Sequence, residues 1–211
     1  DIHIEEIERE YQRINSDKFY HTGKYGGTIR ITTGENRDTF EELVKSRHSI
    51  RDFENEEVNI ENVRKAINIA KHCPSACNRQ CTRVHIIARK QKDILAAWLQ
   101  GTGGFQEKID KFLLITGKVT CYREEELYQY IVSASIFAGY LTLALEDQNI
   151  GACVIQRPVI RNKEWELIQR KLSIPLDEQA ILIIGIGKEK KECKVPVSYR
   201  LPYDELVTEH F

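Results

Sequence analysis

The spacing of apolar residues predicts helices along much of this chain. From residue 59 to 73, apolar residues recur every three or four positions, which is the spacing of one helical face. Asn59 is a suitable N-cap for this helix and Pro74 marks its end, while Thr39 is a suitable cap for an earlier one. By the same criteria we predict helices over residues 4–14, 39–46, 59–73, 92–100, 124–148 and 162–172.

Shorter apolar runs predict strands between these helices. They cover residues 83–89, 111–116, 152–155 and 180–186. Glycines within residues 23–34 interrupt the chain before the second helix. In the tail, Pro196 and Pro202 argue against regular structure, because proline cannot donate a backbone hydrogen bond.

The longest predicted helix, residues 124–148, is charged at its start and almost wholly apolar afterwards. Small residues such as Ala134, Ala138 and Gly139 let other elements pack closely against this helix, so we expect a central helix buried on most sides. Gly151 is expected to stop this helix, because glycine readily adopts the left-handed conformation that ends helices.

Length and composition suit one folded domain. The chain has 211 residues, 41% of them hydrophobic, which is enough for one sizeable core and too few for two large ones. Residues 1–38 are highly charged and end in a glycine-rich stretch. We predict that they form an N-terminal extension and that residues 39–211 form the domain.

Charge and hydropathy exclude two classes of partner. A net charge of −1 and a pI near 6.7 provide no general attraction for nucleic acid. No apolar run is long enough to cross a bilayer, and the first residues are charged rather than signal-like. Six cysteines without a secretory leader are typical of reduced thiols. We therefore expect a cytoplasmic protein that binds neither nucleic acid nor membrane.

Two stretches are candidates for binding chemistry. The first is the cluster Arg47-His48-Ser49-Ile50-Arg51, in which arginine supplies a planar fork of charged donors and serine a short hydroxyl donor, as suits a phosphate. The second has small residues that let a flat ligand approach the backbone, followed by amides that both donate and accept hydrogen bonds. Its candidate residues are Pro74, Ser75, Ala76, Cys77, Asn78 and Gln80.

Together these stretches resemble the nitroreductase family that depends on flavin mononucleotide (FMN). The family hallmarks are an R-x-S-x-R/K start and a P-S-x-x-N-x-Q segment, and the likeness runs from about Asp38 to the C-terminus. The resemblance implies a nitroreductase-like α+β fold, with helices flanking a central, mainly antiparallel sheet. It also implies an intertwined homodimer with two equivalent FMN sites at its interface.

The resemblance assigns the FMN phosphate to basic residues at both ends of the domain. Arg47 and Arg200 would pair with the phosphate, while Ser49 and His48 would donate to the phosphate or the ribityl chain. The family commonly has a basic residue two positions before the final arginine. Here Ser198 stands in that place, which removes one positive charge.

The same resemblance places other residues around the flavin ring. Arg51 would lie by the pyrimidine edge, where a cation stabilises the negative charge that builds at N1 and O2 on reduction. Residues 74–78 would come from the partner subunit and pack on the ribityl chain and the ring. A backbone N–H after the long helix would donate to N5; Pro158 has none, so the candidates are Ile155, Gln156 and Arg157.

The implied activity is oxidoreduction by a ping-pong mechanism. NADH or NADPH would deliver hydride to flavin N5 and leave, after which a small-molecule electron acceptor such as a nitroaromatic or a quinone would be reduced in the same place. Because the flavin carries the chemistry, no catalytic side chain is expected. Two alternatives stay open: a flavin enzyme of this fold that catalyses reductive dehalogenation or flavin fragmentation, and a non-catalytic flavin-binding protein.

The cysteines have a competing interpretation as metal ligands. Cys73, Cys77 and Cys81 are spaced by four, which suits one helical face. Pro74 interrupts that helix, however, and no fourth ligand follows at a familiar spacing. We therefore expect no metal site.

Two glycine stretches and two single residues have weak claims to function. The glycines at 101–104 and 185–187 lack the context of phosphate-binding or dinucleotide-binding loops, although the family places the loop ending at Phe105 near the flavin edge. His48 and Cys153 lack the partners of a nucleophilic relay.

Overall fold

The computed structural model of this chain describes residues 27–34, 37–126, 128–156 and 162–211. The chain divides into two compact units. The larger one spans residues 31–193, and the smaller one joins the residues up to Arg30 with residues 194–211. The predicted helix at residues 4–14 lies outside the described residues.

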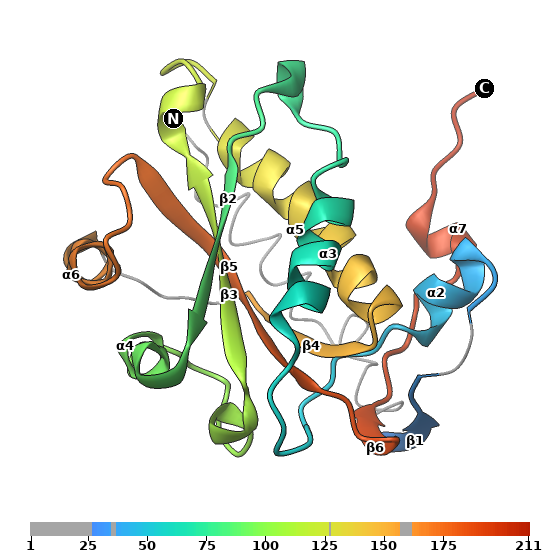
Figure 1. The fold of residues 1–211 in the computed structure, drawn as a ribbon. Coiled ribbons are helices and arrows are strands. Elements are labelled where there is room, and N and C mark those ends of the chain that lie inside the picture. Colours follow the sequence, from blue (N-terminus) through green and yellow to red (C-terminus); the bar gives the residue numbers. More distant parts are fainter. Residues whose placement is uncertain (1–26, 35–36, 127, 157–161) are drawn as a thin grey trace, which may run out of the picture. The chain divides into compact units, whose positions relative to one another are not determined.

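A four-stranded sheet organises the larger unit (Figure 1). Its strands, in spatial order, are β2 (Thr82–Ala88), β3 (Lys111–Lys118), β5 (Glu178–Lys188) and β4 (Ile150–Ile155). All neighbouring strands are antiparallel, which confirms the predicted sheet. The first seven residues of β3 are buried, as its continuous apolar run predicts for a strand covered on both faces.

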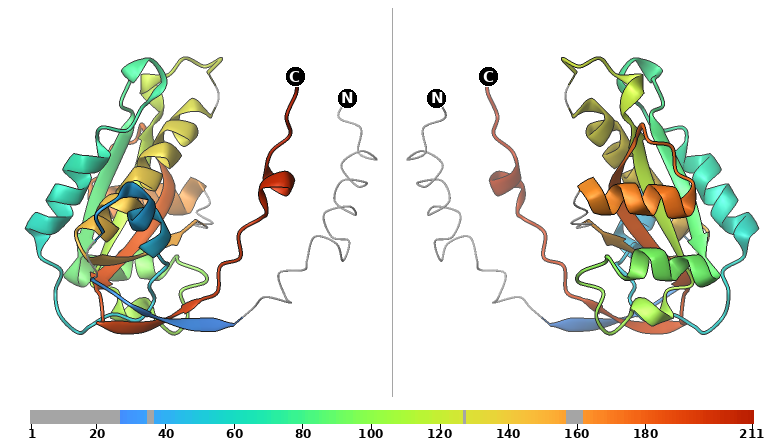
Figure 2. Two further views of the ribbon diagram at one scale, coloured as in Figure 1. Left: turned by 90° about the vertical axis from the view of Figure 1, so that its right-hand side faces the viewer. Right: turned by 90° about the vertical axis from the view of Figure 1, so that its left-hand side faces the viewer.

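Helices cover both faces of this sheet, as Figure 1 and the turned views of Figure 2 show. On one face, α3 (Ile60–Ala70) and α5 (Gln129–Asp147) pack on the sheet and on each other, with α2 (Phe40–Ser46) against α5. On the opposite face, α4 (Lys92–Ala96) and α6 (Asn162–Leu172) contact each other. Short 3-10 turns connect these elements: η2 (Ala76–Asn78), η3 (Arg89–Gln91), η4 (Gln106–Lys108) and η5 (Val119–Cys121).

Local side-chain signals begin α2 and α3 where the sequence predicts. The Thr39 hydroxyl accepts the Glu42 N–H, while the Glu42 carboxylate accepts the Thr39 N–H at 3.0 Å, which forms a capping box. At the start of α3, the Asn59 side chain accepts the Glu61 N–H at 2.9 Å. The amphipathic helix α6 has the predicted bounds.

Three predicted helix boundaries were wrong. The helix α3 ends at Ala70 rather than at residue 73, because the N–H groups of His72 and Cys73 bond to carbonyls only three residues back. The long helix α5 begins at Gln129 rather than near residue 124, because Tyr128 adopts a left-handed conformation with φ of 66°. The helix α4 ends at Ala96 rather than near residue 100. The N–H groups of Trp98 and Leu99 bond to carbonyls only three residues back, so the chain tightens and leaves the helix there.

Gly151 does not stop α5, contrary to the prediction. The left-handed position after the helix is taken by Asn149, with φ of 53°, since asparagine tolerates this conformation better than most residues. Gly151 lies within β4, where an added Cβ would approach the Phe53 ring to 3.1 Å. Its role is therefore close packing.

The prediction that α5 is buried on most sides was also wrong for this chain. One face of α5 contributes Ala134, Ala138 and Leu141 to the core. The other face leaves Val132 and Tyr140 50% and 46% exposed, together with Ile136 and Gly139. Small residues allowed close packing on the sheet side, but none of the described residues covers the outer face.

The tail contains regular structure, which corrects the expectation drawn from its prolines. Strand β6 (Glu192–Pro196) pairs with β1 (Thr28–Thr32) in a two-stranded sheet, and α7 (Tyr203–Leu206) follows. Pro196 is the last residue of its strand and Pro202 precedes the first helical turn. A missing N–H is tolerated at both positions. Strand β1 falls within residues 1–38, the predicted N-terminal extension.

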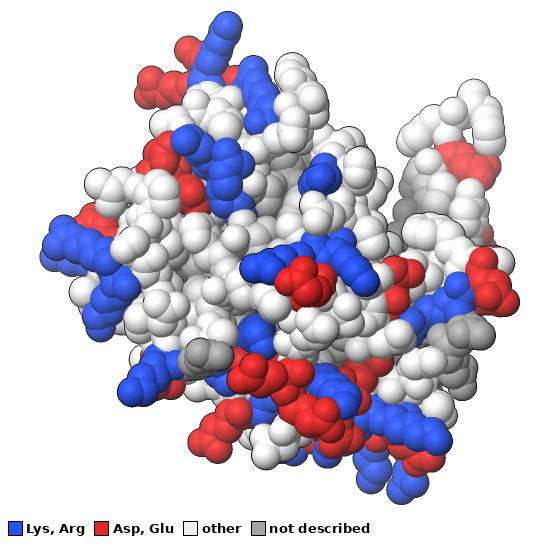
Figure 3. Space-filling view, in the orientation of Figure 1, with Lys and Arg blue, Asp and Glu red and all other residues white. Residues whose placement is uncertain are grey.

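The membrane and charge expectations can be compared with the described part of the chain. None of its helices is long and apolar enough to cross a bilayer. On the face drawn in Figure 3, lysine and arginine side chains lie beside aspartate and glutamate.

Candidate functional site

The predicted phosphate-binding cluster is an extended segment beside β4. Helix α2 ends at Ser46, and Arg47 then turns into an extended conformation with ψ of 119°. Ile50 is buried, and its N–H donates to the Ala152 carbonyl of β4 at 2.9 Å. This bond and the burial of Ile50 fix the segment against the sheet.

Arg47 is half-buried, yet its guanidinium has no hydrogen-bond or ion-pair partner among the described residues. The Ser49 hydroxyl likewise has no partner within that part of the chain. The His48 Nδ1 donates to the Ser46 carbonyl at 2.6 Å, which leaves Nε2 for another contact. A half-buried cation without a counter-ion is suited to bind an anion.

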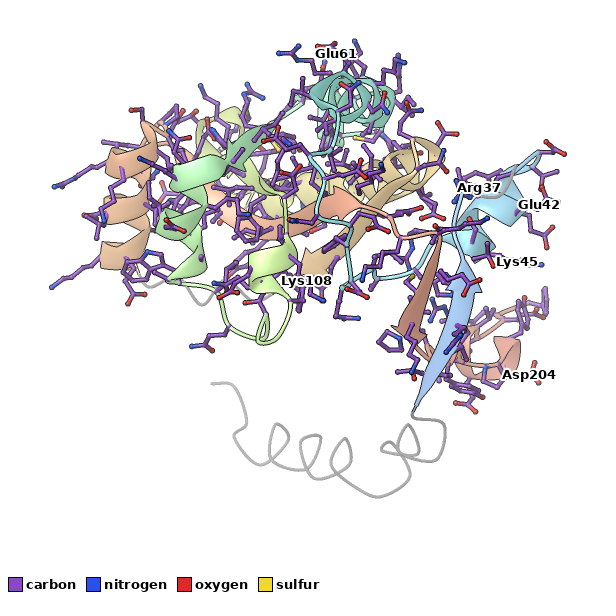
Figure 4. The ribbon with its side chains drawn as sticks, turned by 60° about the horizontal axis from the view of Figure 1, so that its bottom comes forward. Arg37, Glu42, Lys45, Glu61, Lys108 and Asp204 are labelled. Carbon is purple, nitrogen blue, oxygen red and sulfur yellow. The ribbon has the colours of Figure 1, made fainter. Side chains whose placement is uncertain are left out.

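Arg51 has different surroundings. Its guanidinium lies 6.0 Å from the centre of the buried Phe105 ring, and it makes a long contact of 3.4 Å to the Ser49 carbonyl. The neighbouring carboxylate of Asp52 is taken by Lys108 and Lys190, each at 2.8 Å, and these hydrogen bonds lower the pKa of Asp52 (Figure 4 labels Lys108). Arg51 therefore forms no ion pair within the described residues.

The end of β4 lies close to both arginines. Burial raises the pKa of the Cys153 thiol, and the charges of Arg51 and Arg47 oppose this rise. A buried thiol of raised pKa is a poor nucleophile, so the nucleophilic interpretation of Cys153 gains no support. Two residues on, Ile155 is buried, while Gln156 is exposed and its N–H has no acceptor among the described residues. Arg157 lies outside the described residues.

The second predicted stretch, residues 74–80, forms a tight polar turn. The Ser75 hydroxyl accepts the Gln80 N–H at 3.0 Å, and the Asn78 N–H donates to the Ser75 carbonyl at 2.9 Å. Cys77, Asn78 and Gln80 all have left-handed backbones, which cost roughly 1 kcal/mol or more each for residues other than glycine. Pro74, Ala76, Cys77, Asn78 and Gln80 are exposed, and Ser75 is half-buried.

Arg79 anchors this turn to the segment before α5. It pairs with Glu126 at 2.6 Å and lies 4.9 Å from the centre of the Tyr122 ring. The hydrogen bond from Arg79 is the main cause that lowers the pKa of the Glu126 carboxyl group. These contacts hold the strained backbone of residues 77–80 in place.

The two predicted stretches lie at opposite ends of α3 within the chain. Residues 74–80 follow the end of α3 farthest from α2, whereas residues 47–51 lie near its start (Figure 1). An 11-residue helix is ~16 Å long, which is too far for one phosphate or ring to bridge by direct contact. The structure thus brings Arg47, Arg51 and the end of β4 together and leaves residues 74–80 apart.

Ser198 and Arg200 belong to the smaller unit. Both are exposed, and the Arg200 guanidinium donates to the Ser198 carbonyl at 3.0 Å. Their assignment to the phosphate stays a prediction.

Other features noted in the sequence have structural roles. Gly185 and Gly187 lie within β5, where an added Cβ would come within 2.7 Å of Ile109 and 2.5 Å of Phe53. Cys73, Cys77 and Cys81 lie in the turn after α3, and no group of three metal-ligating side chains occurs among the described residues.

A comparison with protein-family models matches residues 44–188 to the model described as the nitroreductase family. The chain belongs to this family. A curated protein of Streptococcus pyogenes serotype M6, provisionally named an NAD(P)H nitroreductase, is 25% identical in an alignment of 202 positions. The alignment covers 80% of this chain and 98% of that protein.

Solved structures share the nitroreductase fold. A Desulfovibrio desulfuricans nitroreductase in complex with FMN is 22% identical with a TM-score of 0.69, over 83% of this chain and 98% of that one. An FMN-dependent nitroreductase from Clostridium difficile R20291 is 25% identical with a TM-score of 0.63, over 80% of this chain and 98% of that one. The nitroreductase-like α+β fold is therefore confirmed.

Two groups of residues in this nitroreductase family member were not predicted from the sequence. The contact of Arg51 with Phe105 was signalled only by the nearby glycine loop. Arg37, which binds Glu146 and Ser46, had no sequence signal, because its partners are about a hundred residues apart.

Proposed function

We propose that this chain binds FMN and reduces small-molecule electron acceptors, such as nitroaromatics or quinones, with NADH or NADPH. The observation that carries the proposal is the pair of arginines beside the end of β4, neither of which has an ion-pair partner among the described residues. Membership of the nitroreductase family supports a flavin oxidoreductase.

The residues present fit the phosphate of FMN. Arg47 offers a planar guanidinium, and the Ser49 hydroxyl lies two residues on; neither has a partner within the described part of the chain. With Nδ1 committed to the Ser46 carbonyl, His48 presents Nε2 as a further contact. Arg200 would add a second cation from the smaller unit.

Arg51 fits a role beside the flavin ring. Phe105 supports its guanidinium from one side, and Asp52 does not neutralise it because two lysines hold that carboxylate. An unneutralised cation near N1 and O2 stabilises the negative charge of a reduced ring. The N–H of Gln156, which has no acceptor among the residues that the structure describes, is the candidate donor to N5, with Ile155 and Arg157 as neighbouring alternatives.

Bound FMN would supply the redox chemistry, accepting hydride from the nicotinamide and passing reducing equivalents to the acceptor. The residues of the chain would bind and orient FMN. Arg47 and Ser49 would hold its phosphate end, and Arg51 would stabilise the negative charge of the reduced ring. No side chain in this arrangement needs to take or give a proton, which agrees with the raised pKa of Cys153.

The proposal includes a homodimer in which each site takes residues from both subunits. The exposed apolar residues Val132, Ile136 and Tyr140 on α5 and Ile69 on α3 support a second copy as the covering partner. Beside them is an open hollow of about 570 Å³, lined by Lys65, Asn68, Ile69, His72, Tyr140 and Gln148. In such a dimer, residues 74–80 of one subunit would complete the site around Arg47 and Arg51 of the other.

The absorption spectrum of the purified protein tests the proposal. We expect flavin bands close to one FMN per subunit after incubation with FMN, and their bleaching by NADH or NADPH without oxygen. Reoxidation by a nitroaromatic or a quinone would complete the test. Bound flavin that neither nicotinamide nucleotide reduces would instead identify a passive flavin-binding protein, and a protein without any flavin affinity would refute the proposal altogether.

A further inference from the structure

Arg37 lies at the centre of a buried group of charges that the proposed chemistry does not use. Its guanidinium donates to the Glu146 carboxylate and to the Glu146 carbonyl, each at 2.7 Å, and to the Ser46 hydroxyl at 2.7 Å. The side chains of Arg37 and Glu146 are only 10% and 7% exposed. Arg37 thereby ties the residues before α2 to the ends of α2 and α5, beside the α2 residues labelled in Figure 4.

A second carboxyl group faces the same place. Glu189 follows β5, and its Oε2 atom is buried without a hydrogen-bond partner among the described residues. Glu189 lines a cavity of about 30 Å³ together with Thr33, Arg37, Ser46, Ile50 and Glu146, among others. The Thr33 hydroxyl donates to the Lys190 carbonyl at 2.6 Å. One guanidinium thus faces two carboxyl groups, so only one of them is compensated when ionised.

The charged groups around Glu189 come from several elements. Burial raises the pKa of Glu189 to about 7, and the Glu146 charge on α5 adds to the rise, while Arg37 opposes it. Cys193 on β6 also lies near the Glu189 carboxyl group. Burial is the main cause that raises the pKa of the Cys193 thiol, and the charge of Glu189 is the second cause. Nearby Asp52 is already paired with two lysines.

The sign of the pH effect follows from these values. The pKa of Glu189 is higher in the folded protein than the ordinary 4.5. The protonation of Glu189 therefore adds to the free energy of unfolding. This stabilisation is complete below about pH 4.5 and is lost as the pH rises through 7. Above that pH, both carboxyl groups carry charge beside a single arginine.

This group is connected directly to the candidate phosphate segment. Ser46, which binds both Arg37 and Glu146, precedes Arg47, and its carbonyl accepts the His48 ring N–H at 2.6 Å. Ile50 is one of the residues that line the cavity, and its N–H bonds to the Ala152 carbonyl of β4. A change of charge in the cavity would therefore act on both ends of residues 46–50.

We propose that Arg37, Glu146 and Glu189 form a proton-dependent clamp that positions residues 46–50 for phosphate binding. While Glu189 is protonated, Arg37 holds Ser46 and Glu146, and Arg47 keeps the orientation that FMN requires. When Glu189 ionises, two carboxylates compete for Arg37 and the segment loosens. The ligand part of this inference rests on the proposed function; the clamp itself does not.

The test compares FMN affinity in the full-length protein and in Glu189→Gln, which keeps the shape of the side chain and removes its charge. From about pH 6 to about pH 8.5, we expect the Kd for FMN to rise about three- to tenfold more in the unmodified protein than in Glu189→Gln. The phosphate of FMN itself titrates near pH 6, but it does so for both proteins. Riboflavin, which lacks the phosphate, should show a smaller difference.

Glu192→Gln serves as the matched control, because Glu192 is an exposed carboxylate of the adjoining strand. It should retain the pH dependence of the unmodified protein. Equal pH dependence in the unmodified protein and Glu189→Gln would overturn the clamp.

A second measurement needs neither flavin nor a variant. In flavin-free protein, hydrogen exchange of the amides in residues 46–51, corrected for intrinsic rates, should show protection that falls between about pH 6 and about pH 8.5. Unchanged protection would overturn the clamp even if FMN binds. Failure to bind FMN at any pH, with protection that still falls, would refute the proposed function and support the clamp.

Discussion

Arg47 and Arg51 lie on one extended segment but differ in what surrounds them. Arg47 is half-buried without a counter-ion among the described residues, a state that costs free energy until an anion binds. Arg51 is exposed to solvent over Phe105, so its charge costs little in the free protein. We therefore expect Arg47 to contribute mainly to binding and Arg51 mainly to the chemistry.

Replacing Arg47 tests the binding role. Arg47→Ala should give folded protein whose affinity for FMN is lower by ~10- to 100-fold, since one charge-assisted phosphate contact contributes roughly 1.5–3 kcal/mol. Arg200→Ala should behave similarly if the tail reaches the phosphate. Titration with FMN, followed by flavin fluorescence, measures the effect. The control is Arg64→Ala, an exposed arginine of α3 paired with Glu61, which should bind FMN normally.

Replacing Arg51 tests the chemical role. Arg51→Gln should leave the affinity for oxidised FMN nearly unchanged, because negative charge near N1 and O2 appears only on reduction. It should lower the reduction potential and slow reduction by NADH or NADPH. Potentiometry and stopped-flow absorbance measure both quantities. A potential equal to that of the unmodified protein would make Arg51 a surface charge and weaken the assignment of the whole Arg47–Arg51 cluster.

Among the elements, β5 depends on glycines for its contact with the segment that carries the arginines. Phe53 follows Arg51 by two residues, and its buried ring packs on Gly187. A Cβ added to Gly187 would approach that ring to 2.5 Å. The Phe53 ring is buried, and the backbone of Phe53 is held in place because it forms a β-bridge with Glu189. This close approach fixes where residues 50–53 cross the sheet.

Gly187→Ala should therefore destabilise the fold by about 1–3 kcal/mol, the usual cost of overpacking a core. Urea unfolding followed by circular dichroism measures the change. Gly103→Ala is the control, since an added Cβ there meets nothing within 4 Å. If the two variants unfold at the same urea concentration, the contact between Phe53 and β5 is looser than the structure indicates.

Elements with strong local signals were predictable from the sequence. Thr39 and Asn59 act as caps through bonds to residues two or three positions away, and α6 shows a clear amphipathic period. The strands β2 to β5 were predictable for the same reason, because alternating apolar residues or continuous apolar runs are patterns of neighbouring residues. The Arg47–Arg51 cluster was visible for the same reason, since its members are adjacent.

Features that depend on distant partners were not predictable. Gly151 had the sequence of a helix stop, but packing under Phe53 gave it a different role and left Asn149 to end α5. Pro196 ends a strand because β1 is available to pair with β6. Arg37 gained its importance from Glu146 at the far end of another helix. Nothing in the residues beside these positions reports such contacts.

For the whole molecule, the main consequence is that one subunit holds only part of the predicted site. Arg47, Arg51 and the end of β4 are together, while residues 74–80 lie at the other end of α3. The strained turn at Cys77, Asn78 and Gln80 is held rigidly by Arg79, as suits a segment that a second subunit presents to a ligand. Flavin binding and dimerisation should then be linked.

Disrupting the exposed face of α5 tests this linkage. Tyr140→Glu places a charge where the proposed partner would pack, so it should yield monomers and, with them, weaker FMN binding, because a ligand bound across an interface stabilises the assembled form. Sedimentation with and without FMN measures both effects. In the unmodified protein, FMN should shift the equilibrium further toward dimers.

Leu167→Glu is the matched control for that variant. Leu167 is 41% exposed and Tyr140 46%, but Leu167 belongs to α6 on the opposite face of the sheet. The same charge should therefore leave both dimerisation and FMN binding unchanged. A Tyr140→Glu monomer that retains normal FMN affinity would mean that residues 74–80 of a neighbour do not contribute to the site. The strained turn would then need a role within its own subunit, and Arg47 and Arg51 would have to hold the flavin without it.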